Sequence, residues 1–175
     1  MQRTAKAHWS GNIKEGKGEL TTQSEILNKT NYSFKTRFLG GEKGTNPEEL
    51  LAAAHAGCFT MAVSYALTEK GLVVIELDAE ATVSMDSAGI TGINLSISGN
   101  VPGLSFEEFE AVTKEAERNC LISKVLSISV SSQAFLVSEK SQLYRAVLHK
   151  DGNVLVPCWV NLVRNKHFLL VLYLS

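Results

Sequence analysis

Residues Asn46–Gly71, NPEELLAAAHAGCFTMAVSYALTEKG, predict one long helix with defined ends. Asn46 is a residue type that caps a first helical turn, and Pro47 suits the first helical position, where no N–H is needed. Glu49 at the third position can complete a capping box with Asn46. Gly71 follows the last turn and predicts its end.

The interior of this helix has no properly polar face. Between Glu49 and Glu69 the only acidic or basic residue is His55. A helix that is apolar all round is covered on every side or lies in a membrane. The run approaches the ~20 apolar residues of a membrane span, but it is rich in alanine and lacks a flanking basic cluster. We therefore expect a central core helix and no membrane partner.

Composition narrows the class of protein. The chain has 175 residues, 45% of them hydrophobic and 20% charged, with a net charge of −1, which fits one ordinary globular domain. This balance gives no electrostatic reason to expect nucleic acid. The N-terminus, MQRTAKAHW, lacks an apolar signal core, which favours a cytoplasmic location. Three cysteines without a CxxC or a Cys/His cluster argue against a zinc site and a disulfide framework.

Alternating polar and apolar residues predict two pairs of antiparallel strands. Lys6–Trp9 and Lys17–Gln23 form a predicted hairpin, and Glu25–Tyr32 then reads as a loop. Ile75–Asp86 alternates strictly, and its predicted partner is Ile93–Ile97. Each strand of the second pair has one apolar face, which the central helix is expected to cover.

The segments next to the central helix are less regular. Phe34–Phe38 alternates and predicts a short edge segment. Leu39–Thr45 is a glycine-rich connection, but a phosphate-binding loop is disfavoured because no GK[ST] follows an apolar strand.

A second helix is predicted from the capping box Ser105–Glu108 to about Asn119. Ile122–Val125 predicts one further turn, and Leu126–Ser131 a third antiparallel-type strand. The order ββ–α–ββ–α–β predicts an α+β domain with two core helices against a mostly antiparallel sheet. The apolar face of the second helix is predicted to hold Phe106, Phe109, Val112 and Ala116.

After residue 137 the sequence no longer shows the regular polar and apolar pattern of the predicted domain. It ends in HFLLVLYLS, which is too short to span a bilayer. This ending is an added strand, a partner contact or a non-native end, and the sequence does not choose among them. We divide the chain into a domain, 1–137, and an atypical extension of unknown role, 138–175.

Cys58 is the leading candidate for chemistry. It stands in the middle of the central helix beside Gly57. The plain interpretation is a buried core thiol. Cys120, at the end of the second helix, allows another: a redox pair, if the fold brings the two together. Peroxide reduction needs one thiolate to attack the O–O bond and a second thiol to resolve the sulfenic acid.

A reactive thiolate needs stabilisation, because a free thiol has a pKa of ~8.5 and burial raises it further. Arg37 is the best-placed cation, and Glu48 could hold it. Glu48 and Cys58 lie ~15 Å apart along one helix, so a shared site requires a two-fold dimer with composite sites. The plain alternatives are a solvated Arg37 and a Glu48 that complements the helix dipole.

Two other functions stay open. His55 precedes Cys58 by three residues, and a Cys–His pair would suit an acyl hydrolase. No Asp or Asn orients this histidine, so a structural role is preferred for it. The second possibility is a non-catalytic protein that binds a small ligand or takes part in a stress-related interaction, with Cys58 inert.

Four segments resemble the OsmC/Ohr family of thiol peroxidases, nearer its OsmC branch. They are AHWSGNIKEGKG, FKTRF, GEKGTNPEELLAAAHAGCFTMAVS and NCLISKVL, and the resemblance covers about residues 4–137. It implies an OsmC-like fold, an intertwined homodimer and no metal or organic cofactor. The implied activity is the reduction of organic hydroperoxides under osmotic and oxidative stress, with regeneration by a dithiol such as a lipoyl protein.

The resemblance also implies roles for four residues. The peroxidatic cysteine falls on Cys58 and the resolving cysteine on Cys120, while the family's arginine and glutamate fall on Arg37 and Glu48. The chain departs from the family pattern in having Leu121 where a proline usually follows the resolving cysteine. The extension 138–175, which contains Cys158, has no counterpart in the family pattern.

Overall fold

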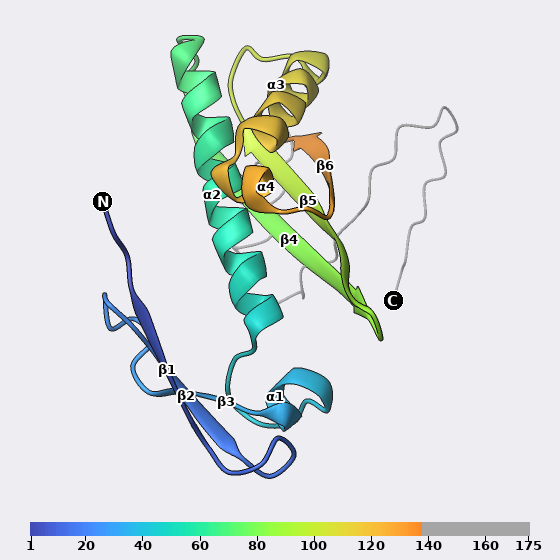
Figure 1. The fold of residues 1–175 in the computed structure, drawn as a ribbon. Coiled ribbons are helices and arrows are strands. Elements are labelled where there is room, and N and C mark those ends of the chain that lie inside the picture. The colour runs from blue at the N-terminus through green and yellow to red at the C-terminus, as the bar shows by residue number, and fades with distance from the viewer. Residues whose placement is uncertain (138–175) are drawn as a thin grey trace, which may run out of the picture. The chain divides into compact units, whose positions relative to one another are not determined.

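The computed structural model describes residues 1–137, which form two three-stranded sheets and four helices (Figure 1). The predictions for 138–175, Cys158 included, lie outside the described residues. In chain order the elements are β1 (Ala5–Ser10), β2 (Lys17–Thr22), β3 (Thr30–Tyr32), α1 (Phe34–Phe38), α2 (Pro47–Glu69), β4 (Glu76–Asp86), β5 (Gly89–Asn100), α3 (Phe106–Asn119), α4 (Leu121–Val125) and β6 (Ser129–Leu136).

The ends of α2 confirm the sequence prediction. The Asn46 side chain accepts a hydrogen bond of 2.8 Å from the Glu49 backbone N–H, although only this half of the predicted capping box forms among the described residues. Gly71 adopts a φ of +74°, and the Leu72 N–H donates to the Leu67 carbonyl across 3.1 Å. This is the glycine-terminated end that the sequence predicts.

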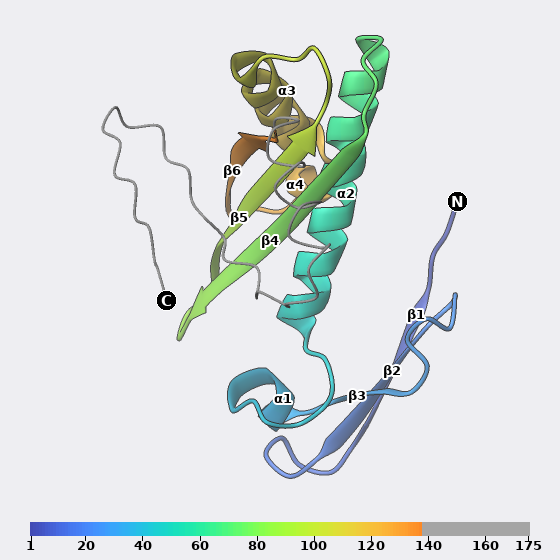
Figure 2. The same ribbon diagram turned by 180° about the vertical axis from the view of Figure 1, so that it is seen from behind.

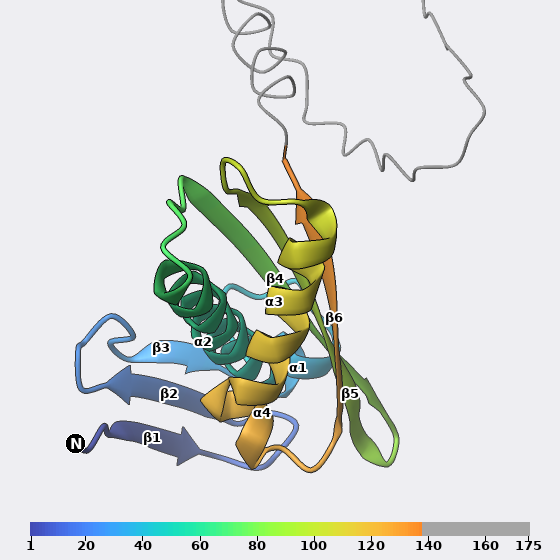
Figure 3. The same cartoon turned by 90° about the horizontal axis from the view of Figure 1, so that it is seen from above.

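Helices α2 and α3 pack side by side on one face of the sheet β4–β5–β6 (Figure 3). The buried stripe of α2 repeats every four residues, as one face of a helix must. It meets the buried residues of β5 and α3 in the hydrophobic core. The core residues of these elements include Phe59, Val63, Leu67, Ile93, Leu95, Ile97 and Phe109.

The opposite face of the same sheet carries the polar residues of the alternating pattern, and neither α2 nor α3 covers it (Figure 2). The antiparallel pairing of β4 with β5 is confirmed and runs from Glu76 opposite Asn100 to Asp86 opposite Gly89. The sequence pattern therefore assigned the correct face of each strand to the core.

Only one face of α2 is covered within the described chain. Met61 is 74% exposed and Tyr65 67% exposed, although we expected this helix to be covered on every side. By length and composition alone α2 could cross a membrane. It nevertheless packs its buried stripe against a sheet, as the core helix of a globular domain does.

The third strand of the core sheet corrects a prediction. Leu126–Ser131 was expected to pair in the antiparallel sense, whereas β6 begins at Ser129 and runs parallel to β5. The helices α3 and α4 form a crossover that returns the chain to the starting end of β5, and such a connection produces parallel neighbours. The remaining strand pairs are antiparallel, so the predicted α+β class with a mostly antiparallel sheet holds.

The segment before α2 also differs from the prediction. Phe34–Phe38 is a helical turn rather than an edge strand, because Ser33 and Thr36 form a reciprocal capping box. Within the predicted loop, Thr30–Tyr32 pairs with β2. On α3, Thr113 is buried while Phe106 is 45% exposed, so the buried face is rotated from the predicted one.

The N-terminal sheet β1–β2–β3 contributes none of the buried core hydrophobic residues in the part of the chain that the structure describes. This sheet is stabilised by the antiparallel pairing of its strands and by a contact between the rings of Trp9 and Tyr32, whose centroids lie 5.4 Å apart. Most residues of β1 are exposed. A sheet of this size has little independent stability without a covered face.

Candidate active site

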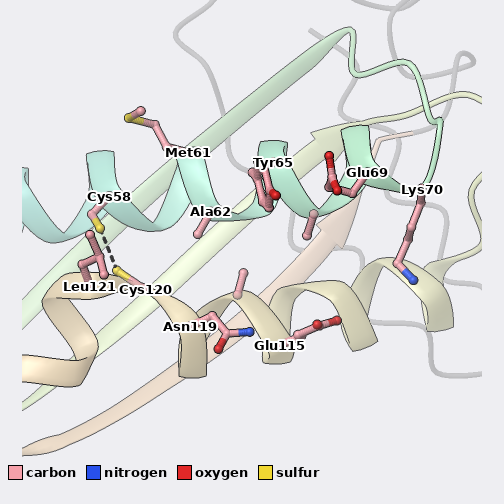
Figure 4. Close-up of a pocket in the computed structure, with 12 residues that line it drawn as sticks. Cys58, Met61, Ala62, Tyr65, Glu69, Lys70, Glu115, Asn119, Cys120 and Leu121 are labelled. Atoms are coloured by element: carbon pink, nitrogen blue, oxygen red, sulfur yellow. Dashed lines mark hydrogen bonds between the residues drawn. The ribbon is translucent and has the colours of Figure 1, made fainter.

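Two cysteines that are 62 positions apart in the sequence meet where α2 packs against the end of α3 (Figure 4). The sulfur atoms of Cys58 and Cys120 lie 3.1 Å apart, and the Cys120 thiol donates to the Cys58 sulfur. Both are free thiols; Cys58 is half-buried and Cys120 only 1% exposed. The structure thus brings together the two sulfurs of the hypothesised redox pair.

The two thiols differ in acidity. Burial by itself raises the pKa of Cys58, but the Cys120 thiol and the backbone amides of Ile122 and Leu121 act in the opposite direction, and the net pKa is lowered. Burial raises the pKa of Cys120, as does its donation to Cys58. The amides of Ser123 and Ile122 and the Ser123 hydroxyl only partly oppose this rise. Cys58 is therefore the more acidic of the two thiols and Cys120 the less acidic.

The backbone around Cys120 explains its position. Its N–H donates to the Ala116 carbonyl across 2.8 Å, which is the last hydrogen bond of α3. Its carbonyl accepts from the Lys124 N–H at 3.0 Å, which is the first hydrogen bond of α4. Between them the Cys120 backbone is extended, with φ −55° and ψ 127°. Leu121 occupies the first position of α4, which is where a proline is favoured, so the chain forms this turn without the family proline.

A pocket of about 950 Å³ extends from the two sulfurs along α2 and α3. Much of its lining is apolar. Lys70 is its only basic lining residue among residues 1–137, and it lies at the end away from the sulfurs (Figure 4). The lining residues are Cys58, Met61, Ala62, Tyr65, Ala66, Glu69, Lys70, Glu115, Ala116, Asn119, Cys120 and Leu121.

Arg37 and Glu48 form the predicted ion pair at the start of α2. The Arg37 Nε lies 3.1 Å from each carboxylate oxygen of Glu48, and Nη2 makes a further bond. The guanidinium also lies 5.0 Å from the centre of the Phe38 ring, within the range of a cation–π contact. The hydrogen bond lowers the pKa of Glu48 and raises that of Arg37, so both remain charged.

This ion pair does not line the pocket that contains the sulfurs. Glu48 lies ten residues before Cys58 on the same helix, a separation of ~15 Å along the axis. Within one described chain the four candidate residues therefore form two separate pairs. The structure brings Cys58 to Cys120 and Arg37 to Glu48, but it does not bring the two pairs together.

His55 has a different partner from the one that an acyl hydrolase would need. It is fully buried, and its Nε2 lies 2.8 Å from the Ser123 hydroxyl of α4. Burial lowers its pKa, which keeps the ring neutral at neutral pH. The same ring nitrogen cannot also serve as base to Cys58.

Sequence reasoning did not identify the amides of Leu121 and Ile122, nor the side chain of Ser123. The sequence gives one indication of these groups, which is the predicted helix end at Asn119–Cys120. A new helical turn that begins there has backbone N–H groups without a partner inside the helix, and they lie beside a cysteine. Residues 1–137 contain no group of three or more His, Cys, Asp or Glu side chains arranged to hold a metal ion.

Comparisons with known proteins agree with this architecture. The sequence model described as OsmC-like protein matches residues 40–133. The Escherichia coli protein named peroxiredoxin OsmC is 43% identical over 135 residues, which cover 75% of this chain and 94% of that protein. The organic hydroperoxide resistance protein OhrA of Bacillus subtilis is 39% identical over 90 residues, which cover 49% of this chain and 62% of OhrA.

A solved structure from Legionella pneumophila, titled as an organic hydroperoxide resistance protein OsmC and predicted redox protein, superposes with a TM-score of 0.59. It is 23% identical and covers 79% of this chain and 98% of its own, so this likeness bears on the fold alone. The family match, the 43% identity to a full-length relative and the shared fold lead to one conclusion. The chain belongs to the family of OsmC-like proteins.

Proposed function

We propose that this protein is a cysteine-dependent peroxidase that reduces organic hydroperoxides to alcohols, with the activity in residues 1–137. The observation that carries the proposal is the 3.1 Å contact in which Cys120 donates to the Cys58 sulfur. It gives one acidic, half-buried thiol and one protonated thiol within bonding reach, which is the arrangement that a two-cysteine peroxidase requires. The names of the relatives in E. coli and B. subtilis point to the same chemistry.

In the first step the Cys58 thiolate attacks the distal oxygen of the hydroperoxide. An S–O bond forms, the O–O bond breaks, and the leaving alkoxide takes a proton to become the alcohol. Cys58 is oxidised to a sulfenic acid as the peroxide is reduced by two electrons. The half-buried position of Cys58 leaves its sulfur open to the pocket from which the peroxide would arrive.

In the second step Cys120 loses its proton and attacks the Cys58 sulfenic acid. An S–S bond forms, the S–O bond breaks, and the hydroxide leaves as water after taking a proton. An external dithiol, such as a lipoyl protein, then reduces the disulfide by thiol–disulfide exchange and is itself oxidised. Net, one hydroperoxide and one dithiol give an alcohol, water and a disulfide, and no metal or organic cofactor takes part. A reducing cytoplasm would supply this dithiol.

We infer that Arg37 acts on the Cys58 of a second copy of the chain, in an intertwined homodimer. Three features support this. The ion pair and the sulfurs lie ~15 Å apart along α2, the β1–β3 sheet has no core residue within residues 1–137, and the pocket-side residues Met61 and Tyr65 are exposed. A second copy would cover these surfaces and supply the missing cation, with Glu48 holding the guanidinium in place.

The pocket supports an organic rather than an inorganic peroxide as substrate. Its lining near the sulfurs is mostly apolar, with Met61, Ala62 and Tyr65 on α2 and Leu121 on α4. Burial of an alkyl or aryl group there would contribute about 0.8 kcal/mol for each CH₂ removed from water. Hydrogen peroxide has no such group and would gain nothing from this surface.

Stopped-flow oxidation tests the proposal. We expect cumene hydroperoxide to oxidise the reduced protein at least tenfold faster than hydrogen peroxide, because about 2 kcal/mol of apolar burial is available only to the organic substrate. Cys58→Ser should lose turnover, whereas Cys120→Ser should still form the alcohol once and stop at the sulfenic acid. Turnover by Cys58→Ser would contradict the proposal.

A further inference from the structure

His55 connects the central helix to the short helix beside the sulfurs. It lies on α2 one turn before Cys58 and is fully buried. Its Nε2 lies 2.8 Å from the Ser123 hydroxyl, which belongs to the first turn of α4. This α4 segment begins at Cys120 and carries the amides that act on Cys58. The two-step cycle proposed above assigns no role to this link.

The position of the proton on His55 follows from its surroundings. Burial lowers the pKa of His55, so the ring is neutral and carries a single N–H. Its Nδ1 has no hydrogen-bond partner among the described residues. A buried N–H without an acceptor costs more than a ring nitrogen without a donor. The proton therefore belongs on Nε2, which donates to the Ser123 oxygen.

The Ser123 hydroxyl then has its own hydrogen to donate. Among the hydrogen bonds of the described residues this hydroxyl has no partner other than His55. Cys120 is the N-cap of α4 and Ser123 is the third residue of this helix, so the two side chains lie at the same end of α4. The hydroxyl and the amide of Ser123 both act to lower the pKa of the Cys120 thiol. An oxygen that accepts from His55 directs its hydrogen away from His55, so this hydrogen is available to a thiolate at Cys120, three residues earlier in the same turn.

We propose that His55 is a positioning residue for the second half of the cycle, because it holds the Ser123 hydroxyl so that this group donates to the Cys120 sulfur as it becomes a thiolate. The inference rests on the proposed peroxidase function. The Cys120 proton goes to the departing hydroxide, while His55 and Ser123 neither gain nor lose a proton. The link favours attack by Cys120 and leaves the first step, between Cys58 and peroxide, unchanged.

Single-turnover kinetics separate the two steps. His55→Leu removes the donor, and the matched variant His55→Gln retains an amide N–H near the place of Nε2. Ser123→Ala removes the hydroxyl itself. A hydrogen bond to a charged group corresponds to about a tenfold effect on rate or more. We expect disulfide formation to slow about tenfold in His55→Leu and in Ser123→Ala, with sulfenic acid formation within about twofold of the wild type.

The double variant His55→Leu/Ser123→Ala should be no slower than Ser123→Ala alone, because the two residues act through one hydroxyl. His55→Gln should recover most of the lost rate. Loss of both steps to the same extent in His55→Leu would overturn the inference. So would a His55→Gln variant that is no faster than His55→Leu.

A second measurement distinguishes positioning from simple loosening of α4. In a Cys58→Ser/Cys158→Ser background, Cys120 is the one remaining cysteine of the sequence, so the pH dependence of alkylation reports the acidity of that thiol alone. We expect the midpoint to rise in His55→Leu and Ser123→Ala and to return in His55→Gln. The charged residues that line the pocket, Glu69, Lys70 and Glu115, are identical in every variant and cancel in the comparison. An unchanged midpoint in both His55→Leu and Ser123→Ala would overturn the inference.

The two proposals fail in different ways. A wild-type protein that forms no sulfenic acid with any hydroperoxide would overturn the peroxidase function before a His55 variant is made. The alkylation comparison would still decide whether the link between His55 and Ser123 acts on Cys120. Normal sulfenic acid formation with unchanged disulfide formation in His55→Leu would overturn only the positioning role.

Discussion

Cys120 directs its thiol hydrogen at the Cys58 sulfur across 3.1 Å, so each thiol contributes to the surroundings in which the other ionises. Their acidities are therefore linked, with the pKa of Cys58 lowered and that of Cys120 raised. A disulfide has an S–S distance of about 2.05 Å, so the oxidised bond requires a contraction of only about 1 Å. The packing of α2 against α3 has already brought the sulfurs to this distance before any oxidant arrives.

The acidity of Cys58 gives the first prediction. Its pKa is lowered and that of Cys120 is raised, and a thiolate becomes more populated as pH rises through its pKa. Alkylation of Cys58 by iodoacetamide should therefore reach half its maximal rate at a lower pH than alkylation of Cys120. Cys120→Ala removes the donor and should raise this midpoint, while Cys120→Ser, which keeps a hydroxyl donor, should raise it less. A wild-type midpoint for Cys58 at or above the ~8.5 of a free thiol would show an ordinary buried thiol, as a non-catalytic protein would have.

The proposed composite site gives the second prediction. Arg37→Met should lower the rate of Cys58 oxidation by about a hundredfold or more, because removal of one preorganised donor has effects of this size. Arg37→Lys keeps the charge but not the paired bonds to Glu48, so it should recover only part of the rate.

Mixed dimers then show which chain supplies the arginine. Co-expressed Cys58→Ser and Arg37→Met chains form heterodimers that contain one complete site only if Arg37 acts across the interface. With random pairing the mixture should regain about a quarter of the wild-type activity, since half of the dimers would each have one intact site. No activity above that of the two separate variants would place Arg37 and Cys58 in the same chain or remove Arg37 from the site.

Oxidation should stabilise the fold. A disulfide between Cys58 and Cys120 closes a loop of 62 residues, and the chain-entropy treatment gives about 4 kcal/mol of added unfolding free energy for a loop of this length. Urea denaturation of protein oxidised by one equivalent of hydroperoxide, compared with reduced protein, measures this difference. Cys58→Ser is the control and should unfold at the same urea concentration under both conditions. Equal midpoints for oxidised and reduced wild type would contradict the predicted pairing.

Two glycines give a matched test of the core. A Cβ at Gly99 would lie 2.6 Å from Cζ of Phe109, which is fully buried, so Gly99→Ala should lose about 1–3 kcal/mol of unfolding free energy. A Cβ at Gly57 would meet no atom within 4 Å, so Gly57→Ala should gain up to about 1 kcal/mol as a helix-interior substitution. Thermal and urea unfolding measure both variants. Equal losses in the two would refute the packing explanation.

The dependence of stability on acid should include Glu48. Its pKa is lowered in the folded chain by the hydrogen bond from Arg37, so the carboxylate favours the folded state above its ordinary value of 4.5. This contribution is lost as pH falls below 4.5 and through the lowered pKa. Glu48→Gln should therefore flatten the acid side of the stability profile and leave its slope between pH 6 and 8 unchanged. Identical acid slopes in the two proteins would contradict a role of this carboxylate in folding.

Local signals in the sequence were sufficient for the elements that depend on neighbouring residues. The ends of α2 follow from Asn46, Pro47 and Gly71, and the faces of β4 and β5 follow from strict alternation. The direction of β6 depends on the path of α3 and α4 in space, and alternation in a strand does not report its direction. Helix α1 was missed because FKTRF alternates like a strand while its cap, Ser33, lies outside the apparent pattern.

The candidate site also combines features that the sequence predicts with features that depend on the path of the chain in space. The sequence could nominate Cys58 and Cys120, and the pairing of Arg37 with Glu48 follows from charge and from an apolar setting. The amides that act on Cys58 are backbone groups without a residue signature, so only the fold reveals them. The His55–Ser123 bond joins residues 68 positions apart, a separation that no periodic pattern encodes.

The parallel placement of β6 has a consequence for synthesis. Strand β5 can gain this neighbour only after α3, α4 and the residues up to Leu136 have left the ribosome. Until then α2, β4 and β5 form a partly built nascent core in which the edge of β5 is unpaired, and an unpaired edge favours mispairing. Chaperone demand for this chain should therefore be greatest while β6 is still being translated.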